Sequence, residues 1–129
     1  MAWVLIVMVL ALLQFYGFGI AVARARGRYG VAAPATTGHP VFERYFRVQM
    51  NTHEQLVAFL PAIWLFAQFY DPRWAAALGA VYLTGRQIYF MSYVKEPKSR
   101  SLGFALTSLP TLGMLAGVLY YAVKLLLLR

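Results

Sequence analysis

Residues 42–54, with the sequence FERYFRVQMNTHE, place charged and amide side chains where a long apolar segment begins. Side chains three, four and seven positions apart share one face of a helix. The spacing therefore puts Arg47, Asn51 and Glu54 on one polar stripe, whereas Gln49 lies off that stripe. Ionisable residues in a membrane helix usually belong to a functional site. The stripe is therefore the first candidate for such a site.

The stripe also has a simpler interpretation, in which Arg44 and Arg47 extend to lipid headgroups and Glu54 is their counter-charge. It explains the arginines well. It explains less well why Asn51 and Glu54 lie deeper on the same face, where an unpaired polar group costs at least a few kcal/mol. Glu43 is spaced to pair with Arg47. Spacing alone leaves both interpretations open.

A second polar stripe consists of Arg86, Tyr89 and Tyr93, near the end of a later apolar segment. These residues recur at i, i+3 and i+7 and so share a helix face. Tyrosines at such a depth are also typical of the aromatic belt at a membrane interface. We expect both stripes to meet the same membrane boundary, because one helix begins there and the other ends there.

The composition indicates an all-α integral membrane protein. Of its 129 residues, 61% are hydrophobic and 12% are charged, which is too apolar for a soluble domain of this size. The formal net charge of +8 comes from short Lys and Arg clusters between apolar segments, where topology-setting charges lie. No nucleic-acid-binding motif is present, so we expect no nucleic-acid partner. The chain has no cysteine, so sulfur chemistry would need a thiol brought by a ligand.

Four apolar segments predict one domain, residues 1–129, built as a four-transmembrane-helix bundle. The expected helices cover residues 2–23, 41–70, 74–94 and 102–128. Each is long enough to cross a bilayer at about 1.5 Å per residue. Residues 24–40 are rich in Gly and Pro and are expected to form a loop. A cleaved signal peptide is the alternative for the first segment, but its apolar run is too long and lacks a basic start.

Proline and glycine positions add detail to this bundle. Pro61 is expected to kink the second helix, and the Asp71-Pro72 pair to end it. In the fourth helix, the motif Gly113-x-x-x-Gly117 is a weak indication of close helix contact.

The basic residues predict the orientation of the bundle. Residues 24–28 hold three arginines, and residues 95–100 hold two lysines and Arg100. In a four-span protein both clusters lie on the same side, which the positive-inside rule makes cytoplasmic. Both polar stripes would then meet the cytoplasmic boundary.

The combination F-E-R-x-x-R-x-Q-x-N-x-x-E, a later R-x-x-Y-x-x-x-Y and a trailing basic cluster resembles the MAPEG superfamily, the membrane-associated proteins of eicosanoid and glutathione metabolism. The resemblance is strongest to its microsomal glutathione transferase and leukotriene C synthase branch. It spans nearly the whole chain and includes the segment Pro-x-Thr-Thr-Gly at residues 34–38.

The resemblance implies a homotrimer of four-helix protomers that binds glutathione between subunits as a co-substrate, near the cytoplasmic side. Arg100 would be catalytic and would activate the thiol. The implied glutathione-binding residues are Arg47, Gln49, Asn51 and Glu54 from one subunit, and Arg86, Tyr89 and Tyr93, together with Arg100, from its neighbour; Arg26 also matches a family arginine that reaches the ligand. Guanidinium groups suit the carboxylates of glutathione, and Glu54 suits its ammonium.

Two positions depart from the leukotriene C synthase branch. Gln55 stands where that branch commonly has tyrosine, and Gly27 stands where it has an arginine assigned to the lipid epoxide side. These differences favour a broad glutathione transferase, or a glutathione peroxidase, that acts on lipophilic small molecules arriving through the membrane.

Three alternatives fit the sequence less well. A non-catalytic lipid-binding relative would lack the thiol-activating arginine or the glutathione stripe, and this chain keeps both. A small transporter would carry charged residues in the middle of its first or last span. These two spans are uncharged apart from Lys124, which lies near the end of the last span. A metal site is not expected, because His39 and His53 lie without Cys or clustered carboxylates.

Overall fold

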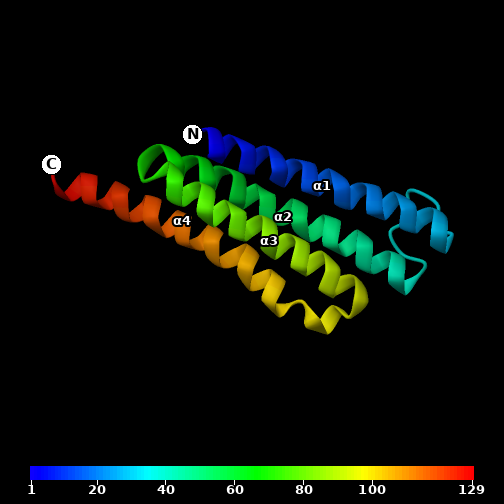
Figure 1. Ribbon diagram of the computed structural model, residues 1–129. Coiled ribbons are helices and arrows are strands. Elements are labelled where there is room, and N and C mark those ends of the chain that lie inside the picture. The colour runs from blue at the N-terminus through cyan, green and yellow to red at the C-terminus, as the bar shows by residue number, and fades with distance from the viewer.

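The computed structural model describes all 129 residues as a bundle of four antiparallel helices (Figure 1). The 3-10 helix η1 joins the last two, and the elements are α1 (Ala2–Tyr29), α2 (Pro40–Phe69), α3 (Pro72–Lys95), η1 (Pro97–Ser99) and α4 (Ser101–Leu127). α2 and α3 each pack against both α1 and α4, which lie on opposite sides of the bundle. The α1–α2 and α3–α4 connections lie at one end, and both termini lie at the other (Figure 1). The predicted all-helical class is confirmed.

α1 is longer than the sequence predicted. The expected loop at residues 24–40 was wrong in its first part, because the helix continues through the three arginines to Tyr29. It ends at Gly30, whose φ of 69° lies in the left-handed region that glycine adopts without strain. Arginine and alanine favour the helix, and the single Gly27 inside it is not enough to end it. The arginines therefore lie on a helix surface rather than in a loop.

The next two helices begin with a side-chain cap followed by proline. The Nδ1 atom of His39 accepts a hydrogen bond of 3.1 Å from the backbone N–H of Val41, which assigns this histidine a structural role. A carboxylate oxygen of Asp71 accepts a bond of 2.8 Å from the backbone N–H of Arg73. That backbone hydrogen bond holds the pKa of the Asp71 carboxyl below its ordinary value.

The close contact between α3 and α4 lies at different glycines from the predicted pair. A Cβ atom on Gly113 would meet no atom within 4 Å, so the predicted contact is wrong at this residue within the protomer. A Cβ on Gly117 would lie 2.9 Å from the Phe66 ring of α2, so the predicted close contact is confirmed at the second glycine of the motif. A Cβ on Gly103 would instead collide with the backbone of Tyr89, and a Cβ on Gly85 would lie 2.7 Å from the α4 backbone. The helices therefore meet most closely near their connection. α2 runs through Pro61 without a break in the helix.

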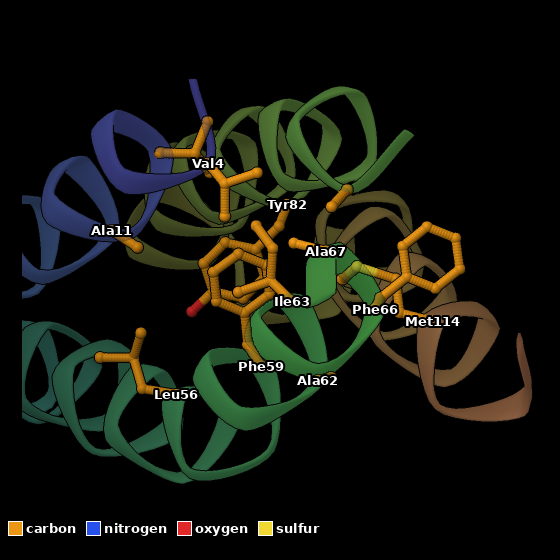
Figure 2. Close-up of a cluster of buried hydrophobic side chains, with 12 residues drawn as sticks. Val4, Ala11, Leu56, Phe59, Ala62, Ile63, Phe66, Ala67, Tyr82 and Met114 are labelled. Carbon is orange, nitrogen blue, oxygen red and sulfur yellow. The ribbon is translucent and has the colours of Figure 1, made fainter. Parts of the chain in front are cut away.

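The main hydrophobic cluster fills the half of the bundle that holds the termini. Phe59 of α2 and Tyr82 of α3 stack with ring centroids 3.7 Å apart, and Val4 and Ala11 of α1 and Met114 of α4 pack in the same cluster (Figure 2). All four helices contribute, so burial of these side chains holds the bundle together. The polar stripes lie in the other half.

The outer surface of the bundle is strongly apolar. Leucines of α1 and α4 such as Leu13, Leu109 and Leu119 are about 60% exposed or more. α1 and the segment Pro97–Leu127 are long and apolar enough to cross a membrane, whereas α2 and α3 do not reach that standard. Such a surface is suited to lipid rather than to water.

Candidate functional site

A cavity of about 250 Å³ lies between α2, α3 and the start of α4. All but one of the residues that line it carry a polar group, and they are Arg47, Asn51, Tyr89, Tyr93, Arg100 and Phe104. Five of these six were predicted from the sequence as glutathione-binding or catalytic residues. The cavity therefore unites the two polar stripes, and it lies at the end of the bundle where the basic connections meet.

Helix geometry places each of these side chains. Arg47 and Asn51 are one turn apart on α2, and Tyr89 and Tyr93 are one turn apart on α3. The two tyrosine rings stack with centroids 5.5 Å apart. The short η1 turn then brings Arg100 to the N-cap of α4, where its Nη1 donates a bond of 3.1 Å to the Pro97 carbonyl. Arg100 itself is exposed.

Arg86 lies beneath the cavity and does not line it. Its side chain is 0% exposed, and its Nε donates a 3.0 Å hydrogen bond to Oγ1 of Thr107. Its Nη1 donates to Oδ1 of Asn51 at 2.9 Å and to Oγ1 of Thr52 at 3.0 Å. Its Nη2 is buried without a partner. Arg86 therefore joins α2, α3 and α4 from inside the bundle.

This buried network orients two of the residues that line the cavity. A guanidinium group only donates hydrogen bonds, so Asn51 must turn its Oδ1 toward Arg86. The NH₂ group of Asn51 is then the part of the amide available to a ligand. The Tyr89 ring lies over the Arg86 guanidinium, with Cζ 4.3 Å from the ring centroid. Arg86 thus acts on the cavity through Asn51 and Tyr89.

Arg47 and Glu54 form an ion pair at 3.9 Å, with both side chains about 60% exposed. Glu54 does not line the cavity itself but lies two turns along α2 from Arg47. The predicted pairing of Glu43 with Arg47 was wrong. Oε2 of Glu43 instead accepts a 3.3 Å bond from the N–H of Gly38 in the α1–α2 loop, which draws this carboxylate away from the stripe.

Gln49 and Arg26 lie apart from the cavity. The Gln49 amide lies over Gly19 of α1, where a Cβ would be 2.7 Å from its Nε2. Nη1 of Arg26 donates a 2.6 Å bond to the Ala35 carbonyl, and its Cζ lies 4.8 Å from the centroid of Phe42. Arg26 therefore holds the α1–α2 loop in this protomer.

Residues that the resemblance assigned to two subunits lie together in one chain. Arg47 and Asn51 were assigned to one subunit, and Tyr89, Tyr93 and Arg100 to its neighbour. These five residues meet in a single chain, because α2 and α3 pack side by side. No second subunit is needed to bring them together.

Four residues of the site were not predicted. Phe104 lines the cavity one turn after Arg100, and Thr52 and Thr107 accept hydrogen bonds from the buried guanidinium. Nη1 of Arg44 donates to the carbonyls of Val94 and Lys95 at 3.2 Å and so closes the end of α3. The sequence signal for the threonines is that they are hydroxyl groups in otherwise apolar helices next to the polar stripes, and Arg44 was considered only as a residue that reaches lipid headgroups.

Comparisons with known proteins place this chain in a family. The model of the MAPEG family matches residues 4–120. The chain is 48% identical over 117 residues to an uncharacterized protein from Synechocystis sp., covering 91% of this chain and 85% of that protein. It is 39% identical to microsomal glutathione S-transferase 2 from Homo sapiens over 110 residues, covering 85% of this chain and 72% of the relative. It is also 39% identical to leukotriene C4 synthase from Cavia porcellus over 127 residues, covering 92% of this chain and 83% of the relative. Since the family model covers nearly the whole chain and such relatives share over a third of its residues, this protein belongs to the MAPEG family.

Proposed function

We propose that this protein is a membrane-bound glutathione transferase that uses the cavity between α2, α3 and α4 to bind and activate the thiol of glutathione. The observation that carries this proposal is the convergence of Arg47, Asn51, Tyr89, Tyr93 and Arg100 on one cavity. The relatives named as glutathione S-transferase 2 and leukotriene C4 synthase support a glutathione-conjugating activity.

The charges around the cavity suit the charges of glutathione, which carries two carboxylates and one ammonium. Arg47 and the NH₂ group of Asn51 supply donors for a carboxylate and a peptide carbonyl. Glu54, paired with Arg47 at 3.9 Å, is close enough to this end of the site to receive the ammonium. The ligand would therefore lie along α2 with its ammonium end toward Glu54 and its thiol toward Arg100.

The start of α4 is suited to a thiolate. Arg100 is its N-cap, and no side chain caps the first backbone N–H groups of this helix. Helix N-termini favour negative charge, and a nearby guanidinium lowers the pKa of a thiol. Arg100 lines this end of the cavity, so we assign it the role of stabilising the thiolate of bound glutathione.

In the transferase reaction, the thiolate forms a carbon–sulfur bond with a lipophilic electrophile. The electron pair of the bond that breaks passes to the leaving group or to the epoxide oxygen. A halide leaves as the anion and the thiol proton passes to solvent, whereas an epoxide oxygen takes up a proton equivalent to the one that the thiol released. Peroxidase activity would start from the same thiolate: a hydroperoxide would be reduced to alcohol and water while two glutathione molecules become a disulfide. The site brings together a water-soluble thiol and a membrane-soluble substrate, which raises their effective concentration.

In the proposed enzyme, which is a homotrimer, all four helices cross the membrane and the cavity lies on the cytoplasmic side. The basic residues of both connections lie at the cavity end, which favours this orientation. α2 and α3 are less apolar because they carry the polar stripes. The cavity of about 250 Å³ is below the range of roughly 300–1,000 Å³ usual for ligand pockets, so a neighbouring subunit would complete it, with Gln49 and Arg26 as its contribution.

A non-catalytic lipid-binding member of the family is the second candidate. The apolar outer surface of α1 and α4 would serve either function. Only the polar cavity distinguishes the two candidate functions. A protein that binds only lipid chains does not need two arginines, an amide and two phenols around one cavity.

Titration of the detergent-purified protein with glutathione, followed by calorimetry, tests the proposal. We expect saturable binding that is lost in Arg47→Ala and kept in the matched surface variant Lys98→Ala. Turnover is then measured with 1-chloro-2,4-dinitrobenzene as the electrophile. Absence of binding at millimolar glutathione in a folded preparation would refute the site, and binding without turnover of any electrophile or hydroperoxide would favour the non-catalytic candidate.

A further inference from the structure

A second cavity, of about 310 Å³, lies at the same end of the bundle but on a different face. It is a groove between α1 and the ends of α2 and α3, and its lining includes Gly17, Ile20, Arg24, Arg28, Tyr45 and Phe90. We propose that this groove binds an anionic phospholipid, with the phosphate at Arg24 and Arg28 and an acyl chain along Gly17 and Ile20. The groove shares no residue with the glutathione cavity, so the inference does not depend on the proposed function.

The α1 side of the groove is a single helical stripe. Residues 17, 20, 24 and 28 are three or four apart and so share a face of the helix. The two arginines lie one turn apart at the end of the stripe nearest the connections, whereas glycine and isoleucine lie deeper. A Cβ on Gly17 would meet no atom within 4 Å, so the deep end is open. The groove is therefore polar at one end and apolar at the other, which matches the polar headgroup and the apolar acyl chains of a phospholipid.

The arginines of the groove have no partner within the protein. Neither Arg24 nor Arg28 takes part in an ion pair or donates a hydrogen bond to the chain, and Arg28 only lies over the Tyr29 ring at 5.5 Å. In contrast, Arg26 on the next face of α1 and Arg44 on α2 both donate to backbone carbonyls. Two unpaired guanidinium groups, side by side above an apolar groove, are complementary to a phosphate on an acyl chain.

Aromatic contacts between three helices form the wall of the groove. The Phe90 ring stacks on Phe18 with centroids 4.7 Å apart, and Tyr45 meets Phe90 edge to face at 5.8 Å. These aromatic contacts hold α1, α2 and α3 together behind the groove. All residues that line the groove come from one chain. The lipid site therefore belongs to one protomer.

Native mass spectrometry of the full-length protein, with dioleoyl phosphatidylglycerol and dioleoyl phosphatidylcholine as probes, tests this inference. We expect phosphatidylglycerol to bind in preference to phosphatidylcholine. Arg24→Gln/Arg28→Gln should weaken phosphatidylglycerol about tenfold or more. The control Lys95→Gln/Lys98→Gln removes two charges from the same end of the bundle and should change binding less than twofold. Equal losses in the two double variants would show attraction by the overall charge and would overturn the site.

A second pair of variants tests the groove without changing charge. Gly17→Leu places a side chain in the open deep end, and Gly113→Leu places the same side chain in open space on α4. We expect only Gly17→Leu to weaken phosphatidylglycerol, by about fivefold or more, with helicity unchanged by circular dichroism. Equal effects of the two variants would rule out a bound acyl chain. Competition by inorganic phosphate at equal concentration would identify a free-anion site instead and would also overturn the proposal.

Discussion

Nη1 of Arg86 donates a 2.9 Å hydrogen bond to Oδ1 of Asn51, so a residue with no access to the cavity fixes the amide that lines it. The same nitrogen donates a hydrogen bond to Oγ1 of Thr52, and the Thr52 hydroxyl in turn donates a 2.7 Å hydrogen bond to the Val48 carbonyl. The α2 side of the cavity therefore depends on a charge buried in α3. This relationship makes Arg86 a positioning residue rather than a ligand-binding one.

We predict that Arg86→Met leaves the bundle folded but weakens glutathione. The threonine hydroxyls keep their bonds to backbone carbonyls, so the main loss is the charge-assisted bond to Asn51. Such a bond is worth roughly 1.5 to 3 kcal/mol, or ten- to a hundredfold in affinity. The measurement is calorimetric titration with glutathione, with circular dichroism for the fold.

A double-variant cycle separates positioning from direct contact. If Arg86 acts through Asn51, Asn51→Ala should weaken glutathione as much as Arg86→Met does, and the double variant should weaken it no further. Fully additive losses would contradict positioning through Asn51 and would mean that Arg86 acts through Tyr89 or reaches the ligand itself.

Glu54→Ala should weaken glutathione by about ten- to a hundredfold with little change in stability. Its ion pair with Arg47 is about 60% exposed, and such surface pairs contribute only about 0 to 1 kcal/mol to folding. A hydrogen bond to the ligand ammonium is worth roughly 1.5 to 3 kcal/mol. Affinity and thermal unfolding are measured on the same preparation. Unchanged affinity with reduced stability would make Glu54 a structural counter-charge of Arg47.

Arg100→Ala should lower turnover while changing the glutathione constant only weakly. An ordinary thiol, with a pKa near 8.5, is only about 3% thiolate at pH 7. Lowering the pKa of the bound thiol to about 6.5 would supply roughly 2.7 kcal/mol and make most of it thiolate. The variant should lose the ultraviolet absorbance of the bound thiolate, and raising the pH should restore part of the rate, because the unassisted thiol then ionises.

The matched control for this prediction is Lys98→Ala, which removes a positive charge from the same connection without touching the cavity. It should leave turnover and thiolate absorbance unchanged. Full activity and an intact thiolate signal in Arg100→Ala would remove Arg100 from the mechanism and pass its role to Tyr93, which also lines the cavity, or to Arg26 of a neighbouring subunit.

Gly103→Ala and Gly113→Ala should change stability in opposite directions. The added methyl at Gly103 would collide with the backbone of Tyr89 and push α4 away from α3, at a cost of about 1 to 3 kcal/mol. At Gly113 the methyl meets open space, so the higher helix propensity of alanine should stabilise by about 0.5 to 1 kcal/mol. Thermal unfolding in detergent measures both. A stabilised Gly103→Ala would mean that the helices do not meet there.

The sequence by itself determined the class of the protein and the composition of both polar stripes. Apolar segments long enough to cross a bilayer and the period of the helix are local properties, so they can be counted along the chain. In this way Arg47 and Asn51, and Tyr89 and Tyr93, were assigned correctly to two helix faces, and the structure brings both pairs to one cavity. The motif combination also identified the family, which the family model confirms.

Tertiary structure decided which face of each helix meets which neighbour, and at what depth. The partners that bury Arg86 lie 21, 34 and 35 residues away in the chain, so no local pattern distinguishes it from Arg47 on the rim. Close packing of α3 and α4 at Gly103 rather than at Gly113 depends on how these two helices cross. The length of α1 depends on the helix cap at Gly30, because Gly27 is another residue at which the helix could have ended. Helical period fixes the direction of a side chain only relative to its own helix. Whether that direction leads to lipid, to water or to another helix is set by packing between distant segments.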